Sequence, residues 1–410
     1  NHIGDWGTQF GMLLLGWKTE LNEAALKQDP IAELERLYKA INADESRRNE
    51  ARAELVKLQS GDEENITIWQ LMIALSQEQF DQVYGRLGVA FDETLGESFY
   101  NPQLPGLVEE LQGEGIAEES EGAMVVRFPG DKQLADKPAI VRKRDGAANY
   151  TTTDLATLKY RMETWSPTDI VYVTDGRQQL HFQQLFNIFG RWQQSASAKL
   201  EHVWFGSILG SDGKPFKTRS GETVRLADLL DEAEERALAV VSEKNPDLPE
   251  AERREIARVV GLGALKYADL SNNRQSDYIF DWDKMLALQG NTAPYLQYAY
   301  TRVRSIFRKL DAPDFTKVEL QLKAPEELAL AKHLMNFGQT LERVAQDYRP
   351  NFLCNYLFEL AGHFSRFYEA CPVLKAEAAE RDSRLALCEL SARVLSSGLD
   401  ALGIEVTEVM

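Results

Sequence analysis

Residues 138–206 carry the pattern that most restricts how this chain of 410 residues can fold. Three short runs of β-branched and aromatic residues, AIVRK, DIVYVT and HVWFG, are separated by two stretches with helical spacing, at 153–164 and 178–191. Because strands that alternate with helices at this spacing usually pair in parallel, the pattern predicts an α/β fold with a parallel sheet. Ligands of such sheets bind beyond the carboxyl ends of the strands, so the segment after Asp175 is expected to face a ligand.

Helical patterns occupy both flanks of this segment. Residues 20–122 are mostly polar, with apolar positions such as Leu34, Leu37 and Ile41 at helical intervals, which indicates an inserted helical subdomain. Residues 281–410 show long apolar stripes with the same period, which predicts a bundle of four or more helices.

The net charge of −18 excludes a protein that binds nucleic acid over its whole surface, because phosphate contacts require Lys and Arg. Any such binding must use local basic patches. The apolar run from Met12 to Trp17 is far too short to cross a bilayer, so no membrane anchor is expected. The three cysteines are expected to be buried reduced thiols, because they form neither a CxxC pair nor a histidine-rich ligand set.

Three residues before the second strand are candidates for a polar ligand site. Tyr150 and Asp154 in YTTTD are four apart at a predicted helix start, so a phenol and a carboxylate can project to one side. Asp154 or the threonines before it could equally cap the helix. Glu97, in GESFYN, is a lone acid after a glycine and reads equally as a surface residue.

Gln178 and His181 stand three apart in the first turn after the second strand, where an amide and an imidazole can meet the polar atoms of a ligand. No second His or Cys lies at metal-ligand spacing, so a neutral His181 would serve hydrogen bonding, and no protein metal site is expected.

The segment SDGKPFKTRSG, residues 211–221, is a loop with three basic residues, Lys214, Lys217 and Arg219. Cations on such a loop can neutralise a transferring phosphoryl group. A solvated basic hairpin is the alternative interpretation.

In GNTAPYLQYAYTRVRSI, Tyr295, Tyr298 and Arg302 share one helical face. Two aromatic rings and a guanidinium can stack on unpaired bases. A plain core stripe is the alternative, since aromatic residues on a bundle helix are commonly buried.

The order and wording of these segments resemble arginyl-tRNA synthetases of bacterial type over the whole chain. The resemblance rests on NHIGDWGTQFGML, RKRDGAANYTTTD, YVTDGRQQLHFQQ, GKPFKTRSG, KYADLSNNRQSDYIFDWDKML and GNTAPYLQYAYTRVRSIF. It implies a Rossmann-like nucleotide-binding catalytic domain with a helical insertion, followed by an all-α anticodon-binding bundle. The implied domains are a remnant of the first catalytic half at 1–19, the insertion at 20–137, the second catalytic half at 138–210, a phosphate loop and junction at 211–280, and the anticodon-binding domain at 281–410.

The resemblance also implies a reaction and its partners. Arginine and ATP, with Mg²⁺, would give arginyl-adenylate and pyrophosphate in a step that requires bound tRNA, and the arginyl group would then move to the 3′-terminal ribose of tRNA(Arg). The implied roles are arginine recognition by Glu97, Tyr150, Asp154 and Gln178, catalytic contacts to the nucleotide and phosphates by His181, Lys217 and Arg219, and anticodon binding by Asn291, Tyr295, Tyr298 and Arg302. A cytoplasmic monomer is expected. The alternative is a catalytically inactive RNA-binding paralogue or fragment.

Two departures from the family pattern qualify these expectations. His2-Ile3-Gly4-Asp5 looks like the family's ATP-binding His-Ile-Gly-His, but its fourth residue is Asp, and this segment follows the true motif in the family. We therefore expect the true motif and an N-terminal domain to be missing, and this chain alone to lack arginine-dependent ATP–pyrophosphate exchange. FKTR replaces the usual Lys-Met-Ser-Lys, which shifts the phosphate role to Lys217 and its neighbours.

Overall fold

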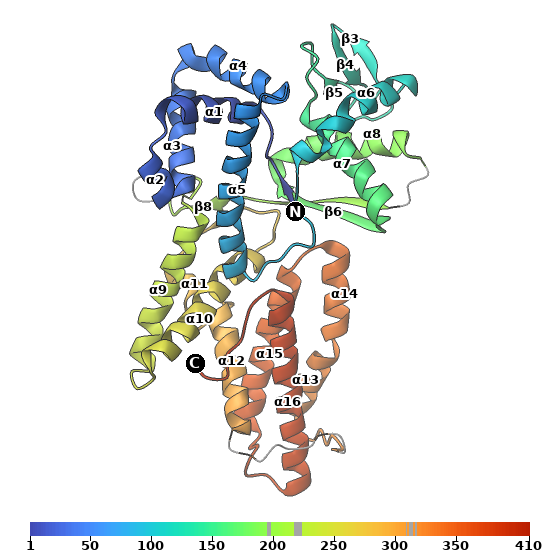
Figure 1. Ribbon diagram of the computed structural model, residues 1–410. Helices are drawn as coiled ribbons and strands as arrows, with labels where there is room; N and C mark the ends of the chain where they lie inside the picture. Colours follow the sequence, from blue (N-terminus) through green and yellow to red (C-terminus); the bar gives the residue numbers. More distant parts are fainter. Residues whose placement is uncertain (195–197, 217–223, 309, 311–314, 316–317) are drawn as a thin grey trace. The chain divides into compact units, whose positions relative to one another are not determined.

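A computed structural model describes residues 1–194, 198–216, 224–308, 310, 315 and 318–410. The chain divides into two compact units (Figure 1). The first contains Asn1–Tyr172 and Gln178–His202, and the second contains Val173–Arg177 and Val203–Met410. In the described part of the chain, no helix has the length and apolar character needed to span a bilayer.

The first unit is a helical cluster followed by a mixed α/β part. Its elements, with the strands that continue into the second unit, are β1 (His2–Ile3), α1 (Thr8–Glu20), α2 (Glu23–Gln28), α3 (Pro30–Ala43), η1 (Glu45–Arg47), α4 (Arg48–Gln59), α5 (Glu63–Arg86), β2 (Leu95–Gly96), η2 (Glu97–Gln103), α6 (Leu104–Gly113), β3 (Glu118–Ser120), β4 (Ala123–Val126), β5 (Ala139–Arg142), α7 (Tyr150–Trp165), β6 (Asp169–Asp175), η3 (Gly176–Gln178), α8 (Gln179–Trp192) and β7 (Lys199–Phe205).

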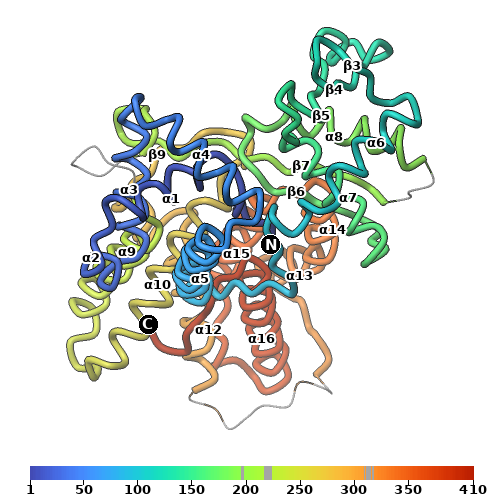
Figure 2. Tube along the Cα trace, turned by 45° about the horizontal axis from the view of Figure 1, so that its top comes forward, coloured from blue at the N-terminus to red at the C-terminus, as the bar shows by residue number. Residues whose placement is uncertain are grey.

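Helix α1 packs with the helices that follow it (Figure 2). Leu14 of α1, Leu34 of α3, Leu58 of α4 and Met72 of α5 share one buried core. Gly11 permits the close approach of α4, because a Cβ there would lie 2.3 Å from the Ala51 carbonyl oxygen. The structure therefore groups α1 with the helical cluster, whereas the sequence prediction separated residues 1–19 from it.

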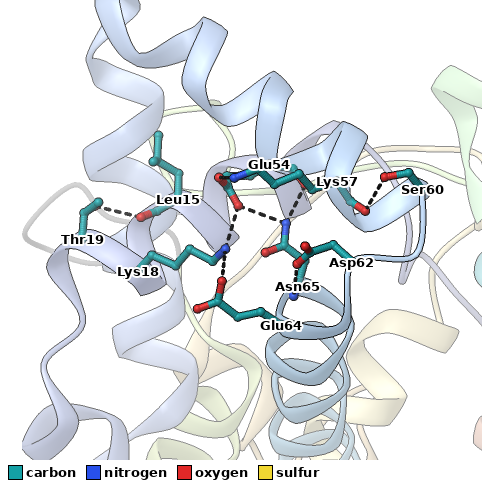
Figure 3. A network of polar contacts seen from close by, with 9 residues as sticks. All are labelled: Leu15, Lys18, Thr19, Glu54, Lys57, Ser60, Asp62, Glu64 and Asn65. Carbon is teal, nitrogen blue, oxygen red and sulfur yellow. Dashed lines mark hydrogen bonds and ion pairs between the residues drawn. The ribbon is translucent and has the colours of Figure 1, made fainter.

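A polar network joins α1, α4 and α5 around the Glu54 carboxylate (Figure 3). The Lys18 ammonium lies 2.9 Å from Glu54 Oε2 and 2.8 Å from Glu64 Oε2. The Lys57 ammonium lies 2.7 Å from Glu54 Oε1, and the Asn65 amide donates to Glu54 Oε2 at 3.0 Å. Each Glu54 oxygen thus has a donor, as a charge removed from water requires.

Strands β3, β4 and β5 form an antiparallel sheet in that order. This corrects one prediction, because AIVRK does not join a parallel sheet. Residues 118–120 form a strand at the end of a segment that is mostly helical, as expected. The turn between β3 and β4 consists of Glu121 and Gly122, both with positive φ, a geometry that matches the twist of a two-residue hairpin. All four residues of β4 are buried. The hairpin therefore offers β5 an apolar neighbour close in sequence.

Strands β6 and β7 pair with each other. Helices α7 and α8 pack in the same core as α6 and β4, with Leu155 and Leu185 fully buried. This arrangement positions the first turns of α7 and α8, where the candidate ligand residues lie.

The second unit is almost wholly helical. Its remaining elements are β8 (Ile208–Leu209), α9 (Leu226–Lys244), α10 (Glu250–Leu270), β9 (Tyr278–Ile279), α11 (Trp282–Met285), α12 (Ala293–Phe307), α13 (Pro325–Met335), α14 (Phe337–Asp347), α15 (Asn351–Ala370) and α16 (Ala378–Ala401). Helices α12, α13, α15 and α16 share one core, as predicted for a bundle. The three cysteines are buried and unpaired, which confirms that expectation.

Candidate functional site

Strands β1 and β2 bring the amino end of the chain beside the start of η2. They pair in parallel, with Ile3 opposite Gly96. The Asp5 carboxylate accepts hydrogen bonds from the Ser98 backbone N–H at 2.8 Å and from the Ser98 hydroxyl at 2.6 Å. Glu97, between Gly96 and Ser98, is thereby held at the first position of η2.

The Glu97 side chain is partly buried, so the interpretation of this acid as a plain surface residue is wrong. Burial, together with the nearby Asp154 and Asp5 carboxylates, raises its pKa to about 7. Within the described part of the chain, no hydrogen bond or ion pair reaches the Glu97 carboxyl. A buried acid with acidic neighbours and no cation is the arrangement expected of a site for a positively charged ligand.

Asp154 lies in the second turn of α7. Asn149 caps this helix, since its side chain accepts from the Tyr150 N–H at 3.0 Å, and the Thr152 hydroxyl bonds to the Val141 carbonyl instead. The capping interpretation of Asp154 and the threonines is therefore wrong. The helix leaves the Asp154 carboxylate available for other contacts.

His181 of α8 makes one of these contacts. Its Nε2 lies 2.6 Å from Asp154 Oδ2, and both side chains are largely buried, with 10% and 20% of their surface exposed. The Tyr150 ring meets the His181 imidazole edge to face at 4.8 Å between centroids. The structure thus brings Tyr150, Asp154 and His181 together, whereas the sequence placed His181 with the nucleotide.

Gln178 lies apart from these contacts. It ends η3 and is exposed at the residue before α8, with no hydrogen bond among the described residues. Its side chain is exposed, and no hydrogen bond among the described residues joins it to Asp154.

His2 completes the surroundings of the carboxylates. Burial lowers its pKa; the Asp154 carboxylate opposes this effect, and the Arg161 guanidinium adds a smaller lowering. A neutral imidazole is expected here at physiological pH. It would leave the negative charge of the site available to a ligand.

The phosphate-contact prediction falls on Lys217 and Arg219, which lie outside the described residues. Within the described residues, no group of three His, Cys, Asp or Glu side chains could hold a metal ion. Mg²⁺ with ATP stays a prediction.

The predicted anticodon residues lie along α12 and just before it. Asn291 accepts from the Tyr267 hydroxyl at 2.5 Å and donates to Asn355 Oδ1 at 3.1 Å. The half-buried Tyr295 ring packs 5.6 Å from Phe358. For Tyr295 the core interpretation is therefore partly right.

Tyr298 and Arg302 are exposed, so the core interpretation is wrong for them. Tyr298, 45% exposed, lines an apolar hollow of about 400 Å³ together with Pro294, Leu286 and Met410. The Arg302 guanidinium lies 5.1 Å from the centre of the Tyr368 ring. The residues of this face therefore present aromatic and cationic groups to solvent, as stacking on bases requires.

Sequence reasoning missed Asp5 as a member of the site. In the sequence Asp5 stands only at the last position of an apparent ATP motif, and its carboxylate bonds to Ser98, 93 positions away. A buried acid after a glycine gives no local signal for such a partner.

Comparison with known proteins defines the class of the chain. Residues 1–282 match the family model described as tRNA synthetases class I (R), catalytic domain, and residues 296–410 match the DALR anticodon binding domain. The fold and the two matches are those of a class I aminoacyl-tRNA synthetase with a helical anticodon-binding domain.

Individual relatives narrow the class. The arginine–tRNA ligases of Chromobacterium violaceum and of an Escherichia coli strain are each 49% identical over the whole chain, which spans 73% of their length. Arginyl-tRNA synthetase structures from Plasmodium falciparum (30% identity, TM-score 0.85, 69% of that chain) and Thermus thermophilus (26%, 0.84, 75%) cover all of this chain. The chain belongs to the arginyl-tRNA synthetase family. These matches do not favour the alternative of an inactive RNA-binding paralogue.

Proposed function

We propose that this chain recognises arginine through the carboxylates of Glu97 and Asp154 and provides the amino-acid site of an arginine–tRNA ligase. The observation that carries the proposal is the partly buried Glu97, whose carboxyl no hydrogen bond or ion pair of the described chain reaches, near Asp154, whose Oδ2 is held by His181. A guanidinium is a planar fork of N–H donors and pairs with carboxylates through two parallel hydrogen bonds. A lysine ammonium cannot satisfy the same acceptors.

In the proposed site, His181 holds one oxygen of Asp154 and leaves the other for the substrate. The contact at 2.6 Å and the Tyr150 ring against the imidazole support this orientation. Gln178, exposed beside the same helix start, would contact the amino-acid end of the substrate.

The proposed reaction has two balanced steps. The arginine carboxylate attacks the α-phosphorus of ATP, which forms arginyl-adenylate and releases pyrophosphate, and a ribose hydroxyl at the 3′ end of tRNA(Arg) then displaces AMP. Lys217 and Arg219 would neutralise the departing pyrophosphate, with Mg²⁺ bound by the phosphates. ATP as the substrate follows from the class of the chain.

We also infer that Asn291, Tyr295, Tyr298 and Arg302 contact the anticodon. Exposed Tyr298 beside an apolar hollow and Arg302 on an aromatic ring support base stacking. The family's role in translation supports action in the cytoplasm. A monomer is our expectation, which sedimentation of the intact enzyme would test.

The experiment for the arginine site is Asp154→Ala in the intact enzyme, assayed by arginine-dependent ATP–pyrophosphate exchange with tRNA. Removing a buried, hydrogen-bonded carboxylate from a charge pair is expected to lower kcat/KM for arginine by about 10²–10³-fold. Glu163→Ala, an exposed acid on the same helix, is the matched control. Unchanged kinetics of Asp154→Ala would overturn the assignment.

A further inference from the structure

We propose that Asp5 is a positioning residue for arginine recognition: it anchors the turn that presents Glu97, and its negative charge acts on the Glu97 carboxyl. The inference rests on the proposed function, because it assumes that Glu97 meets the substrate guanidinium. It assigns a role to the one acidic residue of the NHIGDWGTQFGML segment, which the proposed function leaves unused.

The anchoring is visible in the contacts of Asp5. Its carboxylate is 6% exposed and accepts both the backbone N–H and the hydroxyl of Ser98, at 2.8 and 2.6 Å. The backbone of Gly96 approaches so closely that a Cβ there would lie 2.0 Å from Asp5 Oδ2. Asp5 thus contacts the residues on both sides of Glu97, which fixes the backbone from which the Glu97 side chain projects.

Asp5 is itself held from the opposite side. Its carbonyl oxygen accepts from the Trp69 indole N–H of α5 at 2.8 Å, and Trp69 meets Trp6 edge to face at 5.5 Å. The pairing of β1 with β2 adds a second tether. Asp5 thus links α5 to the start of η2, and the strand pairing holds the same segment independently.

The electrostatic part follows from the neighbours of Glu97. The titratable and charged groups around this cluster are His2 on β1, Asp5 after it, Asp154 and Arg161 on α7, and His181 on α8. Burial, followed by smaller effects of the Asp154 and Asp5 carboxylates, raises the pKa of Glu97 to about 7. Below this pH, Glu97 is protonated and must release its proton when a guanidinium binds.

Two isosteric or near-isosteric changes separate anchoring from charge. In Asp5→Asn, the amide keeps an acceptor for Ser98 but loses the charge, so the pKa of Glu97 should fall. In Ser98→Ala, the Asp5 charge stays but one anchoring bond is lost. Asp81→Asn, an exposed acid on α5, is the matched control.

The experiment measures kcat/KM for arginine and KM for ATP in the intact enzyme with tRNA, between about pH 5.5 and 8.5. For Asp5→Asn we expect the acidic limb of the plot of arginine kcat/KM against pH to move to lower pH by about 0.5 unit. For Ser98→Ala we expect arginine kcat/KM to fall about 5–10-fold at every pH, while the pH of the acidic limb stays unchanged. The KM for ATP should change by less than about two-fold in both variants, because uniform misfolding would affect both substrates.

Three results would overturn the inference. An Asp5→Asn enzyme that folds and keeps the wild-type limb would show that the charge of Asp5 does not act on Glu97. Wild-type arginine kinetics in Ser98→Ala would remove the anchoring role, and this variant decides that role even where Asp5→Asn does not fold. An equal rise of both KM values would indicate a general structural role.

The failure of this inference is distinguishable from failure of the proposed function. Glu97→Gln should abolish the acidic limb and lower arginine kcat/KM whatever Asp5 does. If Glu97→Gln leaves arginine kinetics unchanged, the proposed arginine site itself is wrong. If Glu97→Gln lowers arginine kcat/KM but the Asp5 and Ser98 variants keep wild-type kinetics, the proposed arginine site is supported and the positioning role of Asp5 is refuted.

Discussion

Two glutamates of the first unit, the buried Glu54 and the partly buried Glu97, have opposite electrostatic surroundings. Burial would raise the pKa of Glu54, but hydrogen bonds from Lys57, Lys18 and Asn65 lower it to about 2. Burial and two acidic neighbours raise the pKa of Glu97 to about 7. The first carboxylate is neutralised by its own chain (Figure 3), and the second is not.

The difference teaches how to separate a structural charge from a ligand site. Donors on three helices surround Glu54, so it stabilises the cluster and offers nothing to a ligand. Glu97 retains an unmet preference for a cation, which a substrate guanidinium can satisfy. Burying this carboxyl without a cation costs little stability, because it can bind a proton when the site is empty.

The second unit repeats the contrast with arginines two residues apart. Arg304 lies 3.0 Å from Glu389 and 3.4 Å from Glu408, and both acids belong to the same chain. Arg302 rests on the Tyr368 ring and has no carboxylate partner among the described residues. Arg302 is therefore the arginine of the pair that can meet a phosphate or base.

The largest expected effect is on Glu97. Glu97→Gln preserves the shape of the protonated side chain but removes the charge, so arginine kcat/KM should fall about 10²-fold. The thermal midpoint at pH 8 should not fall, because no ion pair is broken. Exchange kinetics and differential scanning fluorimetry measure the two effects, with Glu114→Gln as the exposed control. A large loss of stability would place Glu97 in the same category as Glu54.

Glu54→Gln should give the opposite result. The variant leaves two lysines without their shared partner, so we expect a loss of about 2 kcal/mol in the free energy of unfolding. Arginine KM should stay within about two-fold of wild type. Glu64→Gln removes the exposed partner of the same Lys18, which should cost less than about 1 kcal/mol. Equal losses in the two variants would contradict the view that burial distinguishes them.

Arg302→Ala and Tyr298→Ala should each weaken binding of tRNA(Arg) by about 5–10-fold, because a cation or stacking ring is lost. Their thermal midpoints should move by less than about 2 °C. Arg304→Ala is the internal control, expected to lower stability and to spare RNA affinity. Filter binding and thermal melts on the same preparations distinguish these outcomes, and a reversal between Arg302 and Arg304 would refute the contrast.

The smallest expected effects are in the pH dependence of stability. The pKa of Glu54 is depressed, so its contribution to the free energy of unfolding is present above about pH 4.5 and is lost as the pH falls toward 2. The pKa of Glu97 is raised, so the stabilisation from its protonated form is complete below about pH 4.5 and is lost as the pH rises through 7. As the pH falls toward 2, the free energy of unfolding of Glu54→Gln should approach that of wild type. Between about pH 4.5 and 7, the free energy of unfolding of Glu97→Gln should rise relative to wild type, by about 1 kcal/mol or less. Denaturant titrations across this range measure both trends.

Much of the fold followed from local patterns. The apolar stripes predicted the helical bundle, since its helices bury continuous faces in one core. The strands of DIVYVT and HVWFG were found as β6 and β7. The hairpin of β3 and β4 was missed because Glu121-Gly122 is an uncommon pair for a turn with two positive φ angles.

The candidate site was predicted less completely. Spacing alone brought Asp154 near Tyr150, but it left open whether Asp154 caps its helix, and only the Asn149 contact decided this. The meeting of Asp154 with His181 depends on how α7 and α8 pack. No periodicity connects residues 27 positions apart on different helices.

By itself, the sequence determined the family, the helical bundle and the residue types that suit a guanidinium, because motifs and amphipathic periods are local and survive without coordinates. Only the tertiary structure decided which carboxylates are neutralised. The Lys18 and Lys57 ammonium groups reach Glu54, while Asp5 and Asp154 approach Glu97. The pKa of a carboxyl depends on burial and on charges within a few ångströms, and these distances are set by the packing of segments that are distant along the chain.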